Sequence, residues 1–139
     1  MSRVIHTEST GKERNRLMRS CAELLRHLST KQTIDTEARD MIACLILSLR
    51  EIERGIDESA AVWEKRDYWM KAEQLRQRWG WVSHAADQLE DLLRQEAWHR
   101  LPEHIVRLLP HFAEIKITRF TRESDLWDGC YERLLSTMH

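Results

Sequence analysis

Basic side chains at helical spacing form the clearest chemistry-bearing pattern in this chain. Lys12, Arg19 and Arg26 are seven residues apart, so on a helix they fall on one ridge, which Arg16 joins and Glu23 interrupts. Cations on such a ridge can bind phosphate groups electrostatically. The alternative is a solvated basic face that attracts a neighbouring acidic helix.

A second basic group follows about fifty residues later. Lys65 and Arg66 stand next to an aromatic run that includes Trp69. If three long helices run up, down and up, the start of the third lies near the start of the first. These two cations would then extend the ridge on the first helix, and Trp69 could stack on an unpaired nucleic-acid base. The sequence therefore offers a nucleic-acid interface as one hypothesis.

Residues suited to catalysis or metal binding are present but do not form a recognised pattern. Glu96 and His99 have the E-x-x-H spacing of di-iron bundles, which need two such motifs and further glutamates. None of Cys21, Cys44 and Cys130 has an obvious base nearby, and the chain has no G-x-S-x-G motif. We therefore predict no catalytic residue, metal or cofactor.

The stretch from 63 to 81, "WEKRDYWMKAEQLRQRWGW", holds four of the six tryptophans. On one helix its apolar residues form two strips, and the first matches the spacing of the other helices' apolar faces. Trp63, Met70 and Trp81 form the second strip, which the short remaining helices could not fully cover. We predict that this strip contacts another protein or a second copy. The alternative is that the last helix folds back and buries it.

Three long helices must position these groups. Thr10 and Glu13 form a T-x-x-E capping box, which predicts a first helix over 11–29. Asp35 begins a second helix, whose "MIACLIL" segment is apolar on every side and should be the most buried.

The remaining boundaries follow from glycine, proline and capping residues. Gly55 predicts a turn, with Asp57 as the N-cap of a third helix over 58–98 that continues through Gly80. Pro102 begins a short helix that ends near Pro110, and Ser124 caps a last one. The alternating "EIKIT" could pair as a strand with "RVIHT" from an extended arm of residues 1–9.

Composition sets the class of protein. The 139 residues are 42% hydrophobic and 32% charged, with only four glycines and two prolines, as in a mostly helical domain spanning 1–139. The longest apolar run is too short to cross a bilayer, and no secretory signal opens the chain, so we expect no membrane partner. Three widely spaced cysteines favour a reducing cytoplasm.

The sequence therefore predicts an all-α bundle of three main antiparallel helices, the third long, plus two shorter C-terminal helices. The leading functional hypothesis is a non-enzymatic interaction or assembly protein that presents an aromatic helix face to a protein partner, with self-association as the simplest case. The alternative is a small nucleic-acid-binding subunit that uses the basic ridge.

Overall fold

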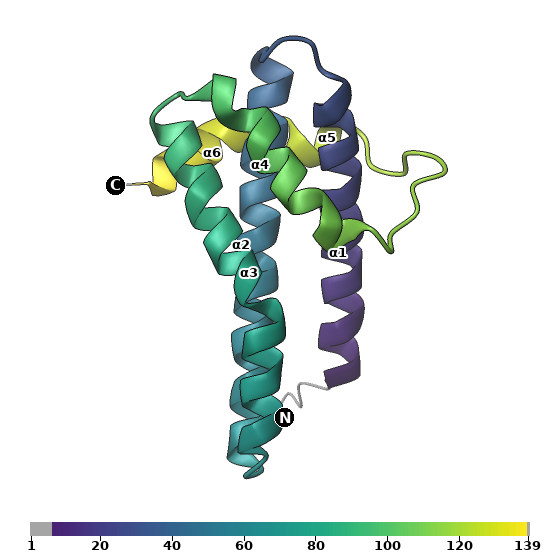
Figure 1. Ribbon diagram of the computed structural model, residues 1–139, viewed down its shortest axis with the longest axis vertical. Coiled ribbons are helices and arrows are strands. Elements are labelled where there is room, and N and C mark those ends of the chain that lie inside the picture. The colour runs from purple at the N-terminus through teal and green to yellow at the C-terminus, as the bar shows by residue number, and fades with distance from the viewer. Residues whose placement is uncertain (1–6, 139) are drawn as a thin grey trace.

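Three long antiparallel helices form the body of the protein. The computed structural model describes residues 7–138, and α1 (Thr7–Thr30), α2 (Thr36–Lys65) and α3 (Trp69–Arg94) follow one another up, down and up (Figure 1). Helix α2 lies in the middle and packs against both neighbours, whereas α1 and α3 hardly touch. The predicted all-α bundle is confirmed, and α3 is long, although α2 is longer still.

Helix α2 is the core of the bundle, as its apolar segment predicts. The Asp35 side chain accepts a hydrogen bond of 2.8 Å from the backbone N of Ala38, so the predicted N-cap is confirmed. The whole run 41–46 is buried because α1, α3 and the C-terminal helices α5 and α6 surround it. An apolar segment that is covered on every side is the expected centre of a helical domain.

The predicted turn at Gly55 and the N-cap at Asp57 are wrong. Helix α2 runs through both residues to Lys65, and the chain reverses only at 66–68. A glycine inside a helix costs only about 1 kcal/mol. Burial of Ile52, Ile56 and Ala60 along the continuing α2 face outweighs that cost.

The predicted start of the first helix is also wrong. Helix α1 begins at Thr7, so Thr10 lies inside it and is not the N-cap of a capping box. Of the predicted extended arm over 1–9, residues 7–9 are helical, and residues 1–6 lie outside the described part of the chain.

The segment after α3 crosses the bundle. Helix α3 continues unbroken through Gly80, as predicted. The chain then turns at Glu96, forms a short 3-10 helix (Trp98–Arg100), and enters α4 (Leu101–Leu108), which has Pro102 in its first turn. Helix α4 and the 3-10 helix that follows it (Leu109–Phe112) fill the space between α1 and α3 in the upper half of the molecule (Figure 1).

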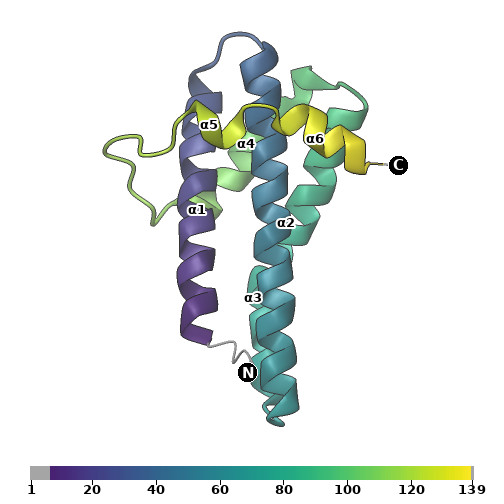
Figure 2. The same cartoon turned by 180° about the vertical axis from the view of Figure 1, so that it is seen from behind.

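The last segment packs on the opposite side of α1 and α2 (Figure 2). A loop over 113–123 leads into α5 (Ser124–Trp127) and α6 (Cys130–Thr137). The predicted last helix is therefore split, because Gly129 adopts φ 79° and reverses the backbone. The Asp40 carboxylate of α2 accepts hydrogen bonds from the backbone N atoms of Gly129 (3.2 Å) and Tyr131 (2.9 Å), which fixes the start of α6.

Two smaller predictions for this region are corrected. Ser124 is the first residue of α5 and Glu123 occupies the N-cap position, with no side-chain cap. The predicted strand over 114–118 is irregular, and no strand occurs among residues 7–138. Its proposed partner, "RVIHT", lies mostly outside those residues.

Candidate functional site

The turn between α2 and α3 is the most exposed apolar part of the molecule. Its backbone is set by two hydrogen bonds to the last turn of α2: Tyr68 N donates to Trp63 O (2.9 Å) and Asp67 N donates to Glu64 O (3.0 Å). This is the bonding pattern of a Schellman motif, in which the residue after the C-cap is left-handed. Asp67 takes that position with φ 62°, and so replaces the glycine that usually ends a helix in this way.

Three consecutive large side chains project from this turn. Tyr68 is 50% exposed, Trp69 60% and Met70 76%, and together we call them the knob. Trp63 lies beneath them, with its ring centroid 5.7 Å from that of Tyr68 in an edge-to-face arrangement. Burial of large apolar side chains is the main source of folding free energy, so three exposed in succession do little for the fold.

Cations surround the knob. The Lys71 ammonium lies 4.9 Å from the centroid of the Trp63 ring and 5.4 Å from that of Tyr68, within cation–π range. Lys65 and Arg66 are exposed at the end of α2. Among the described residues, none of these three cations takes part in an ion pair.

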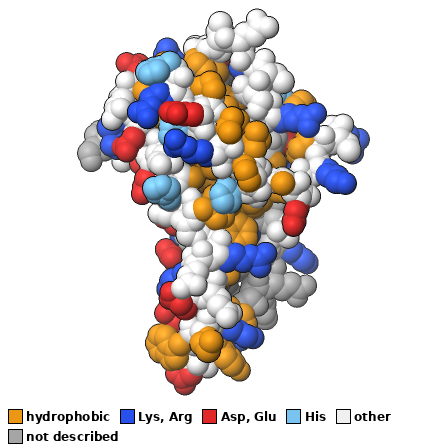
Figure 3. Space-filling model, in the orientation of Figure 1, with side chains coloured by type: hydrophobic (Ala, Val, Ile, Leu, Met, Phe, Trp, Pro, Cys, Tyr) orange, Lys and Arg blue, Asp and Glu red, His pale blue; other side chains and the backbone are white. Residues whose placement is uncertain are grey.

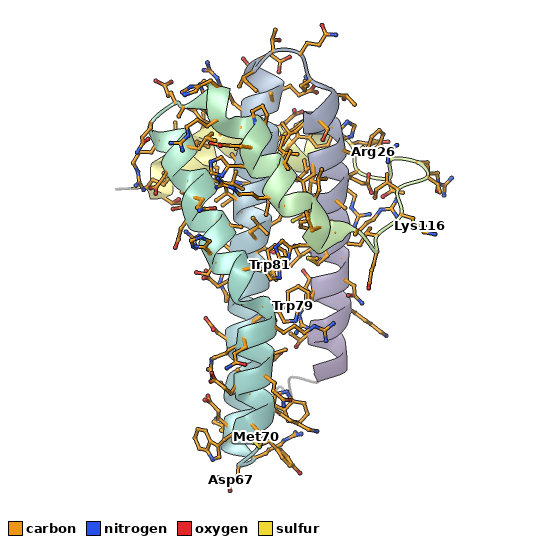
Figure 4. All side chains as sticks on the ribbon, viewed as in Figure 1. Arg26, Asp67, Met70, Trp79, Trp81 and Lys116 are labelled. Carbon is orange, nitrogen blue, oxygen red and sulfur yellow. The ribbon has the colours of Figure 1, made fainter. Side chains whose placement is uncertain are left out.

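The α2–α3 hairpin carries the knob beyond the rest of the bundle. Gly55 of α2 lies beside Thr10 of α1, because a Cβ built on that glycine would be 3.7 Å from Thr10 Cγ2. Helix α2 continues for ten residues past this level, about 15 Å at 1.5 Å per residue. Figures 1 and 2 both show the tip below the start of α1, and Figure 4 places Asp67 and Met70 there. The knob is therefore convex and reachable from several sides.

An apolar groove lies towards the opposite end of the molecule. It forms a pocket of about 410 Å³ between the end of α1, the α1–α2 connection and α4, and we call it the α1–α4 groove. Val106 (66% exposed) and Leu109 (46%) stand on its edge. Figure 3 shows hydrophobic side chains as a band down the upper half of the molecule and again at the tip. The apolar lining of the groove comprises Leu28, Ile34, Trp98, Leu101, Pro102, Ile105, Val106 and Leu109.

The structure separates the predicted aromatic strip. Trp63 lies in the last turn of α2 and Met70 in the first turn of α3, so they reach the knob from two helices rather than lying along one. Trp81 lies eleven residues after Met70 on α3, about 16 Å away along the axis. Its ring stacks on His111 at 3.9 Å between centroids and meets Phe112 edge-on. The prediction of one continuous strip is wrong because the turn falls at 66–68.

The last helix does not cover this strip either. Trp127 packs beside His27, with ring centroids 5.3 Å apart, and Tyr131 packs near Trp98 at 6.4 Å. Helices α5 and α6, which carry these two residues, lie in the half of the molecule away from the knob (Figure 2).

The predicted basic surface is divided as well. Lys65, Arg66 and Trp69 lie at the tip, about 15 Å beyond the level at which α1 begins to contact α2. On α1, Lys12 and Arg26 are exposed, whereas Arg16 pairs with Glu13. The up, down and up order is as predicted, but the longer α2 carries the second group away from the first.

Arg19 and Glu23 have a structural role that the sequence did not reveal. Glu23 is fully buried, and its carboxylate accepts hydrogen bonds from Arg19 Nε (2.8 Å), Thr121 N (2.7 Å), Thr121 Oγ1 (2.6 Å) and Arg122 N (2.9 Å). Burial alone would raise the pKa of Glu23, but these hydrogen bonds outweigh it and lower the pKa to about 2. Glu23 therefore fixes the 113–123 loop to α1.

The same attachment creates a basic surface that spacing could not predict. Arg19 donates hydrogen bonds to the carbonyl oxygens of Lys116 (3.4 Å) and Arg119 (3.0 Å), which brings these two loop cations beside α1. Phe120 is 46% exposed and stacks on His27 with 3.8 Å between ring centroids. The only sequence signal was the i, i+4 spacing of Arg19 and Glu23.

The residues with the chemistry of metal ligands or nucleophiles are dispersed or buried. Glu96 lies in the turn after α3 and His99 in the following 3-10 helix, so they do not share a helix face. Cys21, Cys44 and Cys130 are free thiols in the core, and burial raises the pKa of Cys44 to about 12. Within residues 7–138 no group of three potential ligands could hold a metal ion.

None of the described helices combines the length and the apolar character needed to cross a bilayer. No protein-family model matches the chain, and no curated protein or solved structure is significantly similar to it.

Proposed function

We propose that this protein is a self-associating assembly protein, in which the knob of one copy inserts into the α1–α4 groove of the next. The observation that carries the proposal is the exposure of Tyr68, Trp69 and Met70 at a tip that projects from the bundle. Large aromatic side chains that enter a pocket are the usual anchors of a protein interface. Of the predicted interface residues, Trp63 and Met70 belong to this contact, and Trp81 lies outside it.

A second copy is the favoured occupant because the chain carries both halves of the contact. A knob of three side chains is much smaller than the roughly 800 Å² per partner of a standard interface. Two knobs meeting tip to tip would therefore bury too little area. The α1–α4 groove offers a concave apolar surface with room for a large side chain, and α3 and α4 beside it could add to the contact.

The geometry also sets the form of the assembly. The knob and the groove lie towards opposite ends of the same molecule, so each contact leaves one knob and one groove unused. Such head-to-tail contacts give rings if they close and filaments if they do not. The three buried free cysteines suit a reducing cytoplasm, which we include in the proposal.

The test is the mass in solution, measured by size-exclusion chromatography with light scattering. The native chain is expected to exceed its monomer mass of 16.7 kDa increasingly as concentration rises. Met70→Asp in the knob and Val106→Asp at the groove should each give a monomer. Both side chains are largely exposed, so neither substitution should disturb folding. Leu135→Asp, at an exposed apolar site outside both surfaces, is the matched control and should assemble like the native chain.

Mixing the two variants makes the test sharper. Met70→Asp keeps its groove and Val106→Asp keeps its knob, so the mixture has one functional contact and should stop at a dimer. A native chain that stays monomeric at every concentration, or a mixture that stays monomeric, would refute the proposal. The proposal would also be refuted if the knob bound lipid vesicles or an unrelated protein while this chain itself formed no dimer or larger species.

A second candidate function, nucleic-acid binding, is supported by the surface that α1 shares with the 113–123 loop. Figure 4 shows Arg26 and Lys116 on the same side, and Arg119 and the exposed Phe120 extend this surface. Cations around an exposed ring are suited to a single strand. Arg26→Glu with Lys116→Glu should abolish salt-sensitive binding of single-stranded RNA, whereas Lys65→Glu with Arg66→Glu should not. Absence of binding by the native chain at low salt would exclude this function.

A further inference from the structure

A pocket between α1, α3 and the segment after α4 combines aromatic walls with unpaired positive charge. It has a volume of about 420 Å³, within the range of small-molecule sites. Trp79 and Trp81 line it from α3, and Figure 4 shows both side chains in the space between α3 and α1. Their rings lie 6.1 Å apart between centroids at an interplanar angle of 30°.

Two arginines stand beside these rings: Arg78 lines this pocket, and Arg14 lines the adjoining pocket between α1 and α2, together with Glu13, Glu51 and Glu58. The Arg14 guanidinium lies 5.2 Å from the centroid of the Trp79 ring, and Arg78 lines the pocket next to it. Burial lowers the pKa of Arg14, and the nearby positive charge of Arg78 lowers it further. No ion pair among the described residues includes either arginine, although Glu114 also lines the pocket.

Arg14 also has an unused hydrogen-bond donor. Its Nε is buried and has no hydrogen-bond partner. A buried donor without an acceptor is unfavourable, and two neighbouring cations add repulsion. A shorter polar side chain at position 14 of α1 would avoid both unfavourable terms. An anion bound between Arg14 and Arg78 would satisfy the donor and neutralise the repulsion at once.

We propose that this pocket binds a nucleotide, a ligand that joins a phosphate to a planar ring. The phosphate would lie between Arg14 and Arg78, because guanidinium groups form charge-assisted hydrogen bonds to phosphate oxygens. The base would stack against the rings of Trp79 and Trp81 that line the pocket, and Asn15, which also lines it, offers an amide to the edge of the base. Stacking on His111 holds the Trp81 ring in place from the other side.

The site is separate from the knob and from the α1–α4 groove, so its test does not depend on self-association. Calorimetric titration and thermal melting with adenosine monophosphate are the two measurements. The nucleotide should bind with an affinity that falls as salt increases, and it should raise the melting temperature. Adenosine without phosphate and inorganic phosphate without a base should each bind at least about tenfold more weakly.

Variants separate a binding role from a structural one. Arg78→Gln, on an exposed residue, and Arg14→Gln should each weaken nucleotide binding about tenfold or more. Without ligand, Arg14→Gln should melt at the native temperature or above it, because it removes an unpaired charge. Arg94→Gln, on an exposed arginine at the last residue of α3, is the control and should bind as the native chain does.

Several outcomes would overturn the assignment. One is the absence of nucleotide binding to the native chain at millimolar concentration. Another is binding that neither arginine variant weakens. Inorganic phosphate that binds as tightly as the nucleotide would show a plain anion site, and would exclude stacking on the tryptophans.

Discussion

The two ends of helix α2 differ in what covers them. Around Leu45, α2 contacts α1, α3, α5 and α6, and every side chain over 41–46 is buried. Towards Lys65, α3 is the main neighbour of α2 among the described residues, and the small side chains of Ala60 and Ala72 are buried on these two helices. A pair of helices can bury only the sides that face each other. The large apolar side chains at the tip are therefore free of any role in the core, which is why we assign them to a partner.

The largest expected difference between the two ends is in stability. Leu45→Ala removes a fully buried side chain and should cost about 2–5 kcal/mol of unfolding free energy. Met70→Ala at the 76% exposed tip is the matched substitution and should change it by less than about 0.5 kcal/mol. Urea unfolding of dilute monomer measures both. Equal losses in the two variants would mean that the tip is buried in solution.

A substitution at Glu23 tests the covered end of the molecule, because this carboxylate holds the 113–123 loop against α1. Glu23→Gln should cost about 3 kcal/mol, because the amide cannot replace a carboxylate that accepts four hydrogen bonds. Glu13→Gln is the control on the same helix, where the carboxylate is exposed and paired only with Arg16; it should cost less than about 1 kcal/mol.

Unfolding at different pH values checks the same carboxylate. The pKa of Glu23 falls from an ordinary value of 4.5 to about 2 on folding, so its contribution is complete above pH 4.5. It is lost as the pH falls from about 4.5 towards 2. The native chain should lose about 3 kcal/mol over that interval through this group, and Glu23→Gln should lose correspondingly less. Parallel pH profiles for the two proteins would contradict the role of Glu23.

The fold was largely predictable because helices bury periodic faces. The Asp35 cap, the buried "MIACLIL" segment and the continuity of α3 through Gly80 all follow from local rules. The α2–α3 boundary did not follow, because Gly55 is a stronger local turn signal than Asp67. Burial of Ile56 against the bundle decided the outcome, and spacing along one helix does not show which neighbour covers it.

The candidate sites were less predictable because each depends on segments distant in sequence. Periodicity identified Trp63 and Met70 as apolar but placed them on one helix, and it did not reveal the α1–α4 groove. Arg14 and Arg78 are 64 positions apart, and only the assembled bundle brings both of them beside Trp79. The alternation over 114–118 in the 113–123 loop wrongly predicted a strand. The loop is instead held against α1 by hydrogen bonds of Glu23, Arg19 and Arg122, which join residues about 100 positions apart.

A smaller effect is expected at the turn that forms the exposed end. Asp67→Val places a β-branched side chain at φ 62° and should cost about 1–2 kcal/mol. Asp67→Gly removes the backbone strain but increases the conformational entropy of the unfolded chain. These effects oppose each other, so the unfolding free energy of this variant should stay within about 1 kcal/mol of the native value. If Asp67→Val melted like the native chain, the Schellman turn would not determine where α2 ends.

The smallest effect concerns the glycines inside the helices, on which the length of the exposed hairpin depends. A Cβ at Gly80 would meet nothing within 4 Å, and one at Gly55 would make ordinary contact with Thr10 Cγ2 at 3.7 Å. Since both residues lie within continuous helices, Gly80→Ala and Gly55→Ala should each raise the unfolding free energy by about 0.5–1 kcal/mol. Gly129→Ala is the contrasting control, because φ 79° makes any side chain there unfavourable. Thermal melting of the three variants separates the cases. A loss of stability in Gly55→Ala would indicate that α2 ends near Gly55 after all, and that the hairpin carrying the knob is shorter than described.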